Sequence, residues 1–135
     1  MFTALLASAA LLSATSSSFT FEDRTPKQLV EEFAGYCMNG GSIVSMTDNQ
    51  IACEFPLTRE QKVNALFRHF RQRSYNEQVK QFVSFTAIPS GEGSIGQTRE
   101  WMEAQIGPQT RTVELPINRK GSVRGIMDDM GGVAN

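Results

Sequence analysis

The sequence lacks several features that would each point to a class of protein. It has no long block of like charges, and 13 Lys and Arg nearly balance 14 Asp and Glu, for a net charge of −1. Nucleic acid or an anionic membrane as the main partner would call for a clear basic excess. No apolar run approaches the roughly 20 residues that span a bilayer. We therefore expect no nucleic-acid partner and no stable membrane span after processing.

Side chains with catalytic or metal-binding chemistry are also scarce. His69 is the single histidine, and no G-x-S-x-G motif occurs. Two cysteines and one distant histidine lack the number and spacing of zinc ligands. Adjacent carboxylates such as Glu31 and Glu32 point about 100° apart on a helix and do not converge on one proton. We expect no enzyme, cofactor or metal site; the alternative is a hydrolase that uses His69 as its base.

Residues 1–18 differ from everything that follows. Residues 2–14 are apolar and mostly small, and residues 15–18 form a small polar tail, as in a secretory signal peptide. No Lys or Arg precedes the apolar run, and no A-x-A marks a cut among the candidates between residues 14 and 18. We expect a signal peptide over 1–18 and one domain over 19–135, in a periplasmic or secreted bacterial protein. The alternative is an N-terminal helix.

The stretch over residues 42–56 predicts a β-hairpin. Asp48 and Asn49 form its turn, because both residues tolerate the positive φ values of a tight hairpin. In this register Val44 pairs with Cys53, and alternation places one apolar set on a single face. That set is Val44, Met46, Ile51, Cys53 and Phe55. One face of the hairpin therefore needs a cover.

The positions of the two cysteines are consistent with a helix that covers the apolar face of the hairpin. Cys53 lies on the apolar face of the hairpin, and Cys37 lies on the apolar stripe of a helix expected just before it. A disulfide between them would close a loop of about 17 residues and stabilise the fold by roughly 3 kcal/mol. An exported protein favours the disulfide. The alternative is a pair of buried, reduced thiols.

The remaining pattern predicts an α+β fold. We expect a four- to five-stranded antiparallel sheet with two main helices on one face, in the order helix, hairpin, helix, hairpin, and a short C-terminal helix. The second helix would cover the sheet with Val63, Leu66, Phe67 and Phe70. Residues 94–106 fit a helix or a strand, and a strand is preferred because it gives its neighbour a partner. The expected helices are 25–37, 58–73 and 122–130, and the later strands are 79–88, 94–106 and 110–115.

Both main helices open on the pattern T-x-x-Q-x-V, at Thr25 and Thr58. The order of elements resembles the layout of secreted β-lactamase-inhibitor-type proteins and of small outer-membrane assembly modules. This resemblance concerns topology alone, and no residue role is carried over from it.

Two groups of residues are candidate partner contacts. Arg68, Arg71 and Arg73 form the one local basic cluster, which would meet a protein partner or a small anionic ligand; the alternative is a solvated helix end. Trp101 is the single tryptophan, and on a strand its neighbours Arg99 and Glu103 would share its face. An exposed Trp between charges would anchor a contact, whereas a covered one would simply pack.

We therefore expect a non-catalytic binding or envelope-associated module. The alternative is a secreted inhibitor that docks the Gly-rich loop over residues 89–93 into the cleft of an enzyme.

Overall fold

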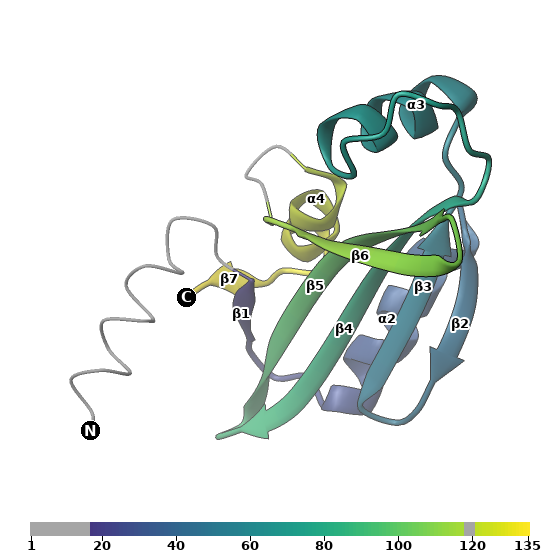
Figure 1. The fold of residues 1–135 in the computed structure, drawn as a ribbon. Coiled ribbons are helices and arrows are strands. Elements are labelled where there is room, and N and C mark those ends of the chain that lie inside the picture. The colour runs from purple at the N-terminus through teal and green to yellow at the C-terminus, as the bar shows by residue number, and fades with distance from the viewer. Residues whose placement is uncertain (1–16, 118–120) are drawn as a thin grey trace.

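A computed structural model describes residues 17–117 and 121–135 (Figure 1). The predicted signal peptide lies almost wholly outside the described residues. The elements are β1 (Ser18–Phe21), α2 (Pro26–Met38), β2 (Ser42–Met46), β3 (Gln50–Phe55), α3 (Arg59–Arg68), β4 (Val79–Ser90), β5 (Gly93–Ile106), β6 (Gln109–Leu115), α4 (Ser122–Asp129) and β7 (Val133–Ala134).

The strands form one antiparallel sheet in the order β2-β3-β4-β5-β1-β7, with β6 also paired to β5. The long strand β5 pairs with two different strands along the same edge. Its first half pairs with β1 and its second half with β6. The prediction of a four- to five-stranded sheet with two main helices on one face is wrong, because the described residues form a seven-stranded sheet. The strands β1 and β7 were missed because segments of four and two residues show too little alternation.

The hairpin of β2 and β3 turns where the sequence predicts. The backbone N–H of Thr47 donates to the carbonyl of Gln50 at 2.8 Å, so Asp48 and Asn49 form the turn. The strand pairing next to the turn is also the expected one.

The hairpin register is wrong beyond the middle of β2. A β-bulge shifts the pairing between Ile43 and Ser45, so Cys53 lies opposite Ile43 instead of Val44. Val44 consequently leaves the covered face, and 56% of its surface is exposed. A bulge adds one residue to one strand and thereby reverses which side chains face the core.

The larger hydrophobic cluster lies between the sheet and the helices α2 and α4. At its centre the ring of Phe33 from α2 stacks on Phe85 of β4, with centroids 5.1 Å apart. The predicted disulfide is present: Cys37 of α2 is bonded to Cys53 of β3, with a Cα–Cα distance of 6.0 Å. Helix α2 is therefore held to the sheet both by packing and by a covalent bond.

A smaller cluster lies under α3, toward the other end of the same sheet face. Leu66 and Phe70 contact the strands there, and six residues are buried in all. The six are Ala65, Leu66, Phe70, Val79, Met102 and Ala104. Helix α3 ends at Arg68, five residues before the expected end. Shortly afterwards Arg71 adopts a positive φ of 55°, which a continuing helix does not allow.

The pattern shared by the two helices is explained by their N-terminal caps. The Thr25 hydroxyl accepts from the N–H of Gln28, and the Gln28 side chain accepts from the N–H of Thr25. Thr58 and Gln61 repeat both bonds at the start of α3. A capping box places Ser or Thr three residues before Glu or Gln, so the cap accounts for the Thr and Gln that the two helix starts share.

Candidate functional site

Helix α3 exposes apolar side chains that the sequence pattern assigns to the core. Val63 is 45% exposed and Phe67 is 63% exposed, so their predicted place on the covered stripe is wrong. The helix lies over the end of the sheet formed by β4, β5 and β6, where Leu66 and Phe70 already cover the strands. Phe67 lies one residue, or 100° around the helix, from Leu66 and so faces away.

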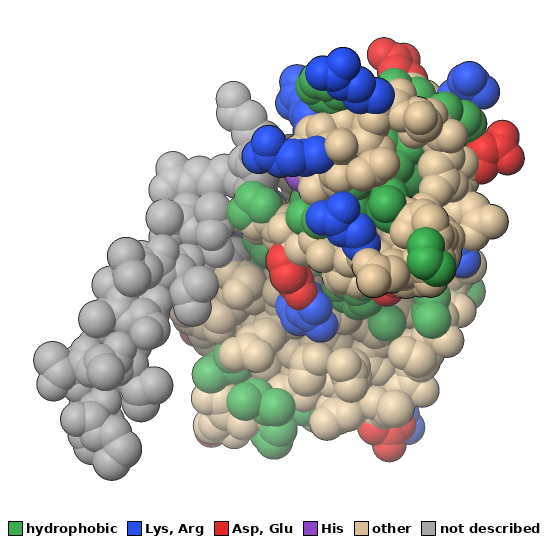
Figure 2. Space-filling view, viewed as in Figure 1, with side chains coloured by type: hydrophobic (Ala, Val, Ile, Leu, Met, Phe, Trp, Pro, Cys, Tyr) green, Lys and Arg blue, Asp and Glu red, His purple; other side chains and the backbone are tan. Residues whose placement is uncertain are grey.

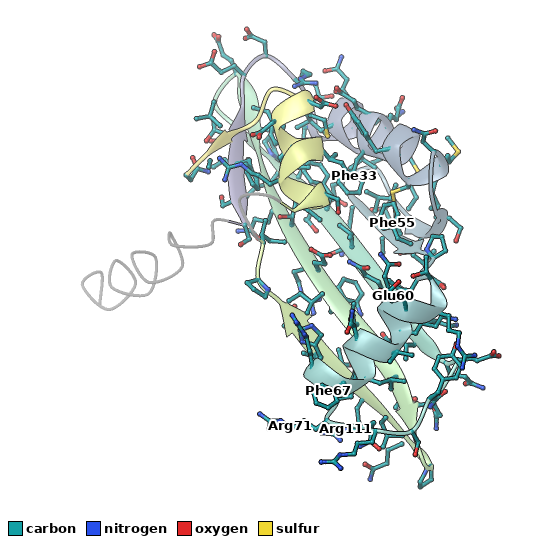
Figure 3. The ribbon with its side chains drawn as sticks, turned by 90° about the horizontal axis from the view of Figure 1, so that it is seen from above. Phe33, Phe55, Glu60, Phe67, Arg71 and Arg111 are labelled. Atoms are coloured by element: carbon teal, nitrogen blue, oxygen red, sulfur yellow. A yellow bond between two sulfur atoms is a disulfide. The ribbon has the colours of Figure 1, made fainter. Side chains whose placement is uncertain are left out.

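Cations surround these exposed residues. The segment over residues 57–78 carries five Lys or Arg against two Glu, a net charge of +3. Arg111 joins them from β6, because its partner in the sheet is Ala104, whose side chain lies under α3. Lys and Arg side chains accordingly gather around α3 in Figure 2, and Figure 3 places Phe67, Arg71 and Arg111 at one end of the molecule. We call Val63, Phe67, Arg68, Arg71 and Arg111 the α3 face.

The structure brings the three predicted arginines together at this end. Arg68 is the last residue of α3, and Arg71 and Arg73 follow in the adjoining loop, all exposed. Among the residues that the structure describes, none of the three forms an ion pair or a side-chain hydrogen bond. Their charges are therefore available to a partner.

Two other cations of α3 are already occupied. The Nζ of Lys62 donates to the carbonyl of Glu77 at 2.9 Å, and the Arg59 guanidinium lies 4.2 Å from the centroid of the Tyr75 ring. Both contacts tie α3 to the loop that follows it. Such contacts stabilise by about 1 kcal/mol each when exposed.

Trp101 lies on the other face of the sheet. Its ring stacks on Phe82 of the neighbouring strand, with centroids 5.4 Å apart, and the Arg99 guanidinium lies 4.7 Å from its centroid. The indole N–H donates to Glu103 at 3.1 Å. Trp101 is thus half-buried by its own neighbours and is not part of the α3 face. Its role as a partner contact stays a prediction.

His69 is the C-terminal cap residue of α3 and is exposed. Its backbone N–H donates to the carbonyl of Ala65 at 2.8 Å. Within the described part of the chain, no side chain orients the imidazole as a general base requires. Residues 17–117 and 121–135 also contain no group of three His, Cys, Asp or Glu that could hold a metal ion.

A polar pair separates the two hydrophobic clusters. Gln81 of β4 donates to the carboxylate of Glu100 on β5. Because Gln81 lies two residues from both Val79 and Val83, it marks the border between the cluster under α3 and the cluster under α2. Burial raises the pKa of the Glu100 carboxyl above its ordinary value of 4.5, and the hydrogen bond from Gln81 opposes this effect.

The predicted docking loop over residues 89–93 is mostly strand. Pro89 and Ser90 belong to β4 and Gly93 belongs to β5, so only Gly91 and Glu92 form the turn. Gly91 supplies the positive φ of 59° that this tight turn needs. Two residues give an inhibitor little to insert into a cleft, so the α3 face is the better candidate surface.

Comparisons with known proteins add no further assignment. No protein-family model, no curated protein and no solved structure matches the chain. In the part of the chain that the structure describes, no helix has the length and apolar character to span a membrane.

Proposed function

We propose that the protein is an exported, non-catalytic binding module that contacts an acidic partner protein through its α3 face. The observation that carries this proposal is Phe67, which is 63% exposed beside arginines without ion pairs. An exposed aromatic ring among free cations matches a partner that offers an apolar pocket rimmed by carboxylates. The overall charge of −1 favours a protein over nucleic acid.

The contact is tested by a photo-crosslinking residue placed at position 67 in the native host. We expect one discrete adduct that weakens with salt and disappears when Arg68→Glu and Arg71→Glu are added, because both charges would then repel the partner. The matched control carries the crosslinker at Ile88, which is 49% exposed but lies on β4 and outside the α3 face. Equal adducts from both positions, or an adduct indifferent to the charge reversals, would reject the proposal.

Export is supported by the disulfide, which fits an oxidising compartment. The hydrogen bonds at the start of β1 also limit where the signal peptide is cleaved. The carbonyl of Ser17 accepts from the backbone N–H of Thr98 at 2.8 Å and from its hydroxyl at 3.3 Å, and Thr98 is only 2% exposed. Removing Ser17 would leave buried donors unpaired, at about 1–3 kcal/mol each. We therefore expect the peptidase to cut before Ser17.

Intact mass with and without reductant, on protein taken from its native host, tests both points. The expected chain begins between residues 15 and 17 and gains two hydrogens on reduction. A mature chain that begins at Ser18 or later would contradict the role of Ser17, and a chain with its leader intact would contradict export.

A further inference from the structure

A polar cleft of about 440 Å³ lies between the loop after α3 and the turn that joins β5 to β6. Its volume falls within the range of roughly 300–1,000 Å³ that small-molecule sites occupy. It is distinct from the α3 face, since none of the residues of that face lines it.

The walls of the cleft are fixed by hydrogen bonds across it. Asn76 donates from its side chain to the carbonyl of Gln105, and its side-chain oxygen accepts from the N–H of Gln78 at 2.7 Å. The N–H of Gln105 donates to the carbonyl of Gln78 at 3.2 Å. The chain's own hydrogen bonds therefore hold the loop against β5, which lowers the cost of ordering on binding.

The side chains that line the cleft keep unused hydrogen-bonding capacity. Within the described residues, the side chains of Ser74, Tyr75, Glu77 and Gln78 have no hydrogen-bond partner. Gln72 donates from Nε2 to the carbonyl of Phe70 at 3.3 Å, which leaves its Oε1 free to accept. These groups offer donors and acceptors together.

The lining also has an apolar part and very little charge. Ile106 supplies the exposed apolar surface, whereas Leu66 is only 1% exposed, and Glu77 is the only acidic or basic side chain among the described lining residues. A phosphate or carboxylate ligand would face Glu77 without a lining cation to pair with. A divalent cation would find one carboxylate, whereas calcium takes six to eight oxygen ligands.

We propose that this cleft binds a short neutral saccharide. Sugar hydroxyls both donate and accept, as the amides and hydroxyls of the lining do. The carboxylate of Glu77 accepts from adjacent hydroxyls, and the C–H face of the ring packs against Ile106. No other charge in the lining needs to be neutralised.

Backbone amide shifts of the isotopically labelled, disulfide-bonded chain test the proposal. The probes are cellobiose, maltose and N,N′-diacetylchitobiose, each titrated to millimolar concentration, with inorganic phosphate as the anionic comparison. We expect at least one disaccharide to cause saturable shifts confined to residues 72–78 and 105–107. The absence of shifts with all three sugars, shifts elsewhere, or equal shifts with phosphate would overturn the proposal.

Two substitutions sharpen the test without removing the bonds that hold the cleft. Tyr75→Phe deletes only a hydroxyl and keeps the ring under Arg59, and Gln78→Ala deletes a side chain whose backbone makes the structural bonds. The double variant should bind the sugar about tenfold more weakly, as the loss of one to two hydrogen bonds predicts. Gln50→Ala, an exposed glutamine on β3, should bind normally, and unchanged binding by the double variant would contradict the assignment.

This proposal does not depend on the α3 face. The sugar titration is read from the cleft amides and the crosslink from position 67, so either result can fail alone.

Discussion

The two hydrophobic clusters on the helix side of the sheet differ in how firmly their helices are held. The α2 cluster contains sixteen buried residues and a disulfide, whereas the α3 cluster contains six buried residues. Burial of apolar surface is the main source of stability, at roughly 25 cal/mol per Å². We call the parts of the fold around these clusters the α2 half and the α3 half. The α2 half therefore supplies most of the stability of the fold, and the α3 half is freer to present side chains to a partner.

The net charge also differs between the two halves of the fold. Helix α2 carries one Lys against two Glu and helix α4 carries one Arg against two Asp, so each is −1. The segment over residues 57–78 is +3. An overall charge near zero thus conceals a basic end, and exposed charge of one sign steers association with partners of the other sign.

The largest expected effect on stability is the difference between replacing a buried phenylalanine and replacing an exposed one. Phe33→Ala should lower the free energy of unfolding by about 3–5 kcal/mol, because it empties the centre of the α2 cluster. Phe67→Ala should change it by no more than about 0.5 kcal/mol, since that ring is largely in water. Urea unfolding of both variants with the disulfide intact measures the difference, and similar losses would show that Phe67 belongs to the core.

Removal of the disulfide should have the next largest effect. The double variant Cys37→Ala and Cys53→Ala should lose about 3 kcal/mol, because the bond closes a loop between residues 16 apart. Amide exchange should then speed up chiefly in α2 and β3. Faster exchange in α3 alone would contradict the division into two halves.

The two capping boxes provide a matched pair of smaller substitutions. Thr25→Ala and Thr58→Ala each remove the same hydroxyl acceptor and should each cost about 1 kcal/mol. We expect Thr25→Ala to lower the global stability, and Thr58→Ala to act mainly on local opening of α3, as read from amide exchange. Identical global losses would show that both halves unfold as one unit.

The smallest effect concerns the polar border between the halves. Because the folded state raises the pKa of Glu100, it binds that proton more tightly than the unfolded chain does. This contribution is therefore complete below the ordinary value of 4.5 and is lost as pH rises through the raised value. Glu100→Gln should be more stable than the native chain at neutral pH, by less than about 1 kcal/mol because the side chain keeps contact with solvent.

Thermal unfolding between acidic and neutral pH measures this difference, which should vanish below pH 4.5. Glu92→Gln, at the exposed turn between β4 and β5, removes the same charge outside the polar border and is the matched control. A Glu100→Gln variant that is less stable than the native chain at neutral pH would show that the carboxylate is stabilised by its surroundings.

Sequence reasoning succeeded where the determinants are local. Asp48 and Asn49 set the hairpin turn through their own backbone preferences, and Thr58 with Gln61 sets the start of α3. The cysteine pair was predictable because each thiol lies on an apolar pattern of its own element. The turn and the cap each lie within four consecutive residues, and the two cysteines are only 16 residues apart.

The predictions from sequence failed where contacts with distant segments determine which side chains are buried. Ile43 and Val44 are both apolar, so their pattern does not reveal which of them the bulge turns outward. The exposure of Phe67 depends on which side of α3 packs on the sheet, and the helical period alone assigns Phe67 to the apolar stripe. The arginine cluster was found from sequence, whereas Arg111 joins it only through the pairing of β6 with β5.

Strand β1 brings the first and last described residues of the chain close together. Thr20 pairs with Val133, and the N–H of Asn135 donates to the carbonyl of Ser18 at 3.0 Å, so the first and last described strands lie side by side. Figures 1 and 3 both show this corner at a distance from α3. The described chain therefore begins and ends at one corner, so a segment that follows Asn135 leaves the fold on the side of Ser18 and away from α3.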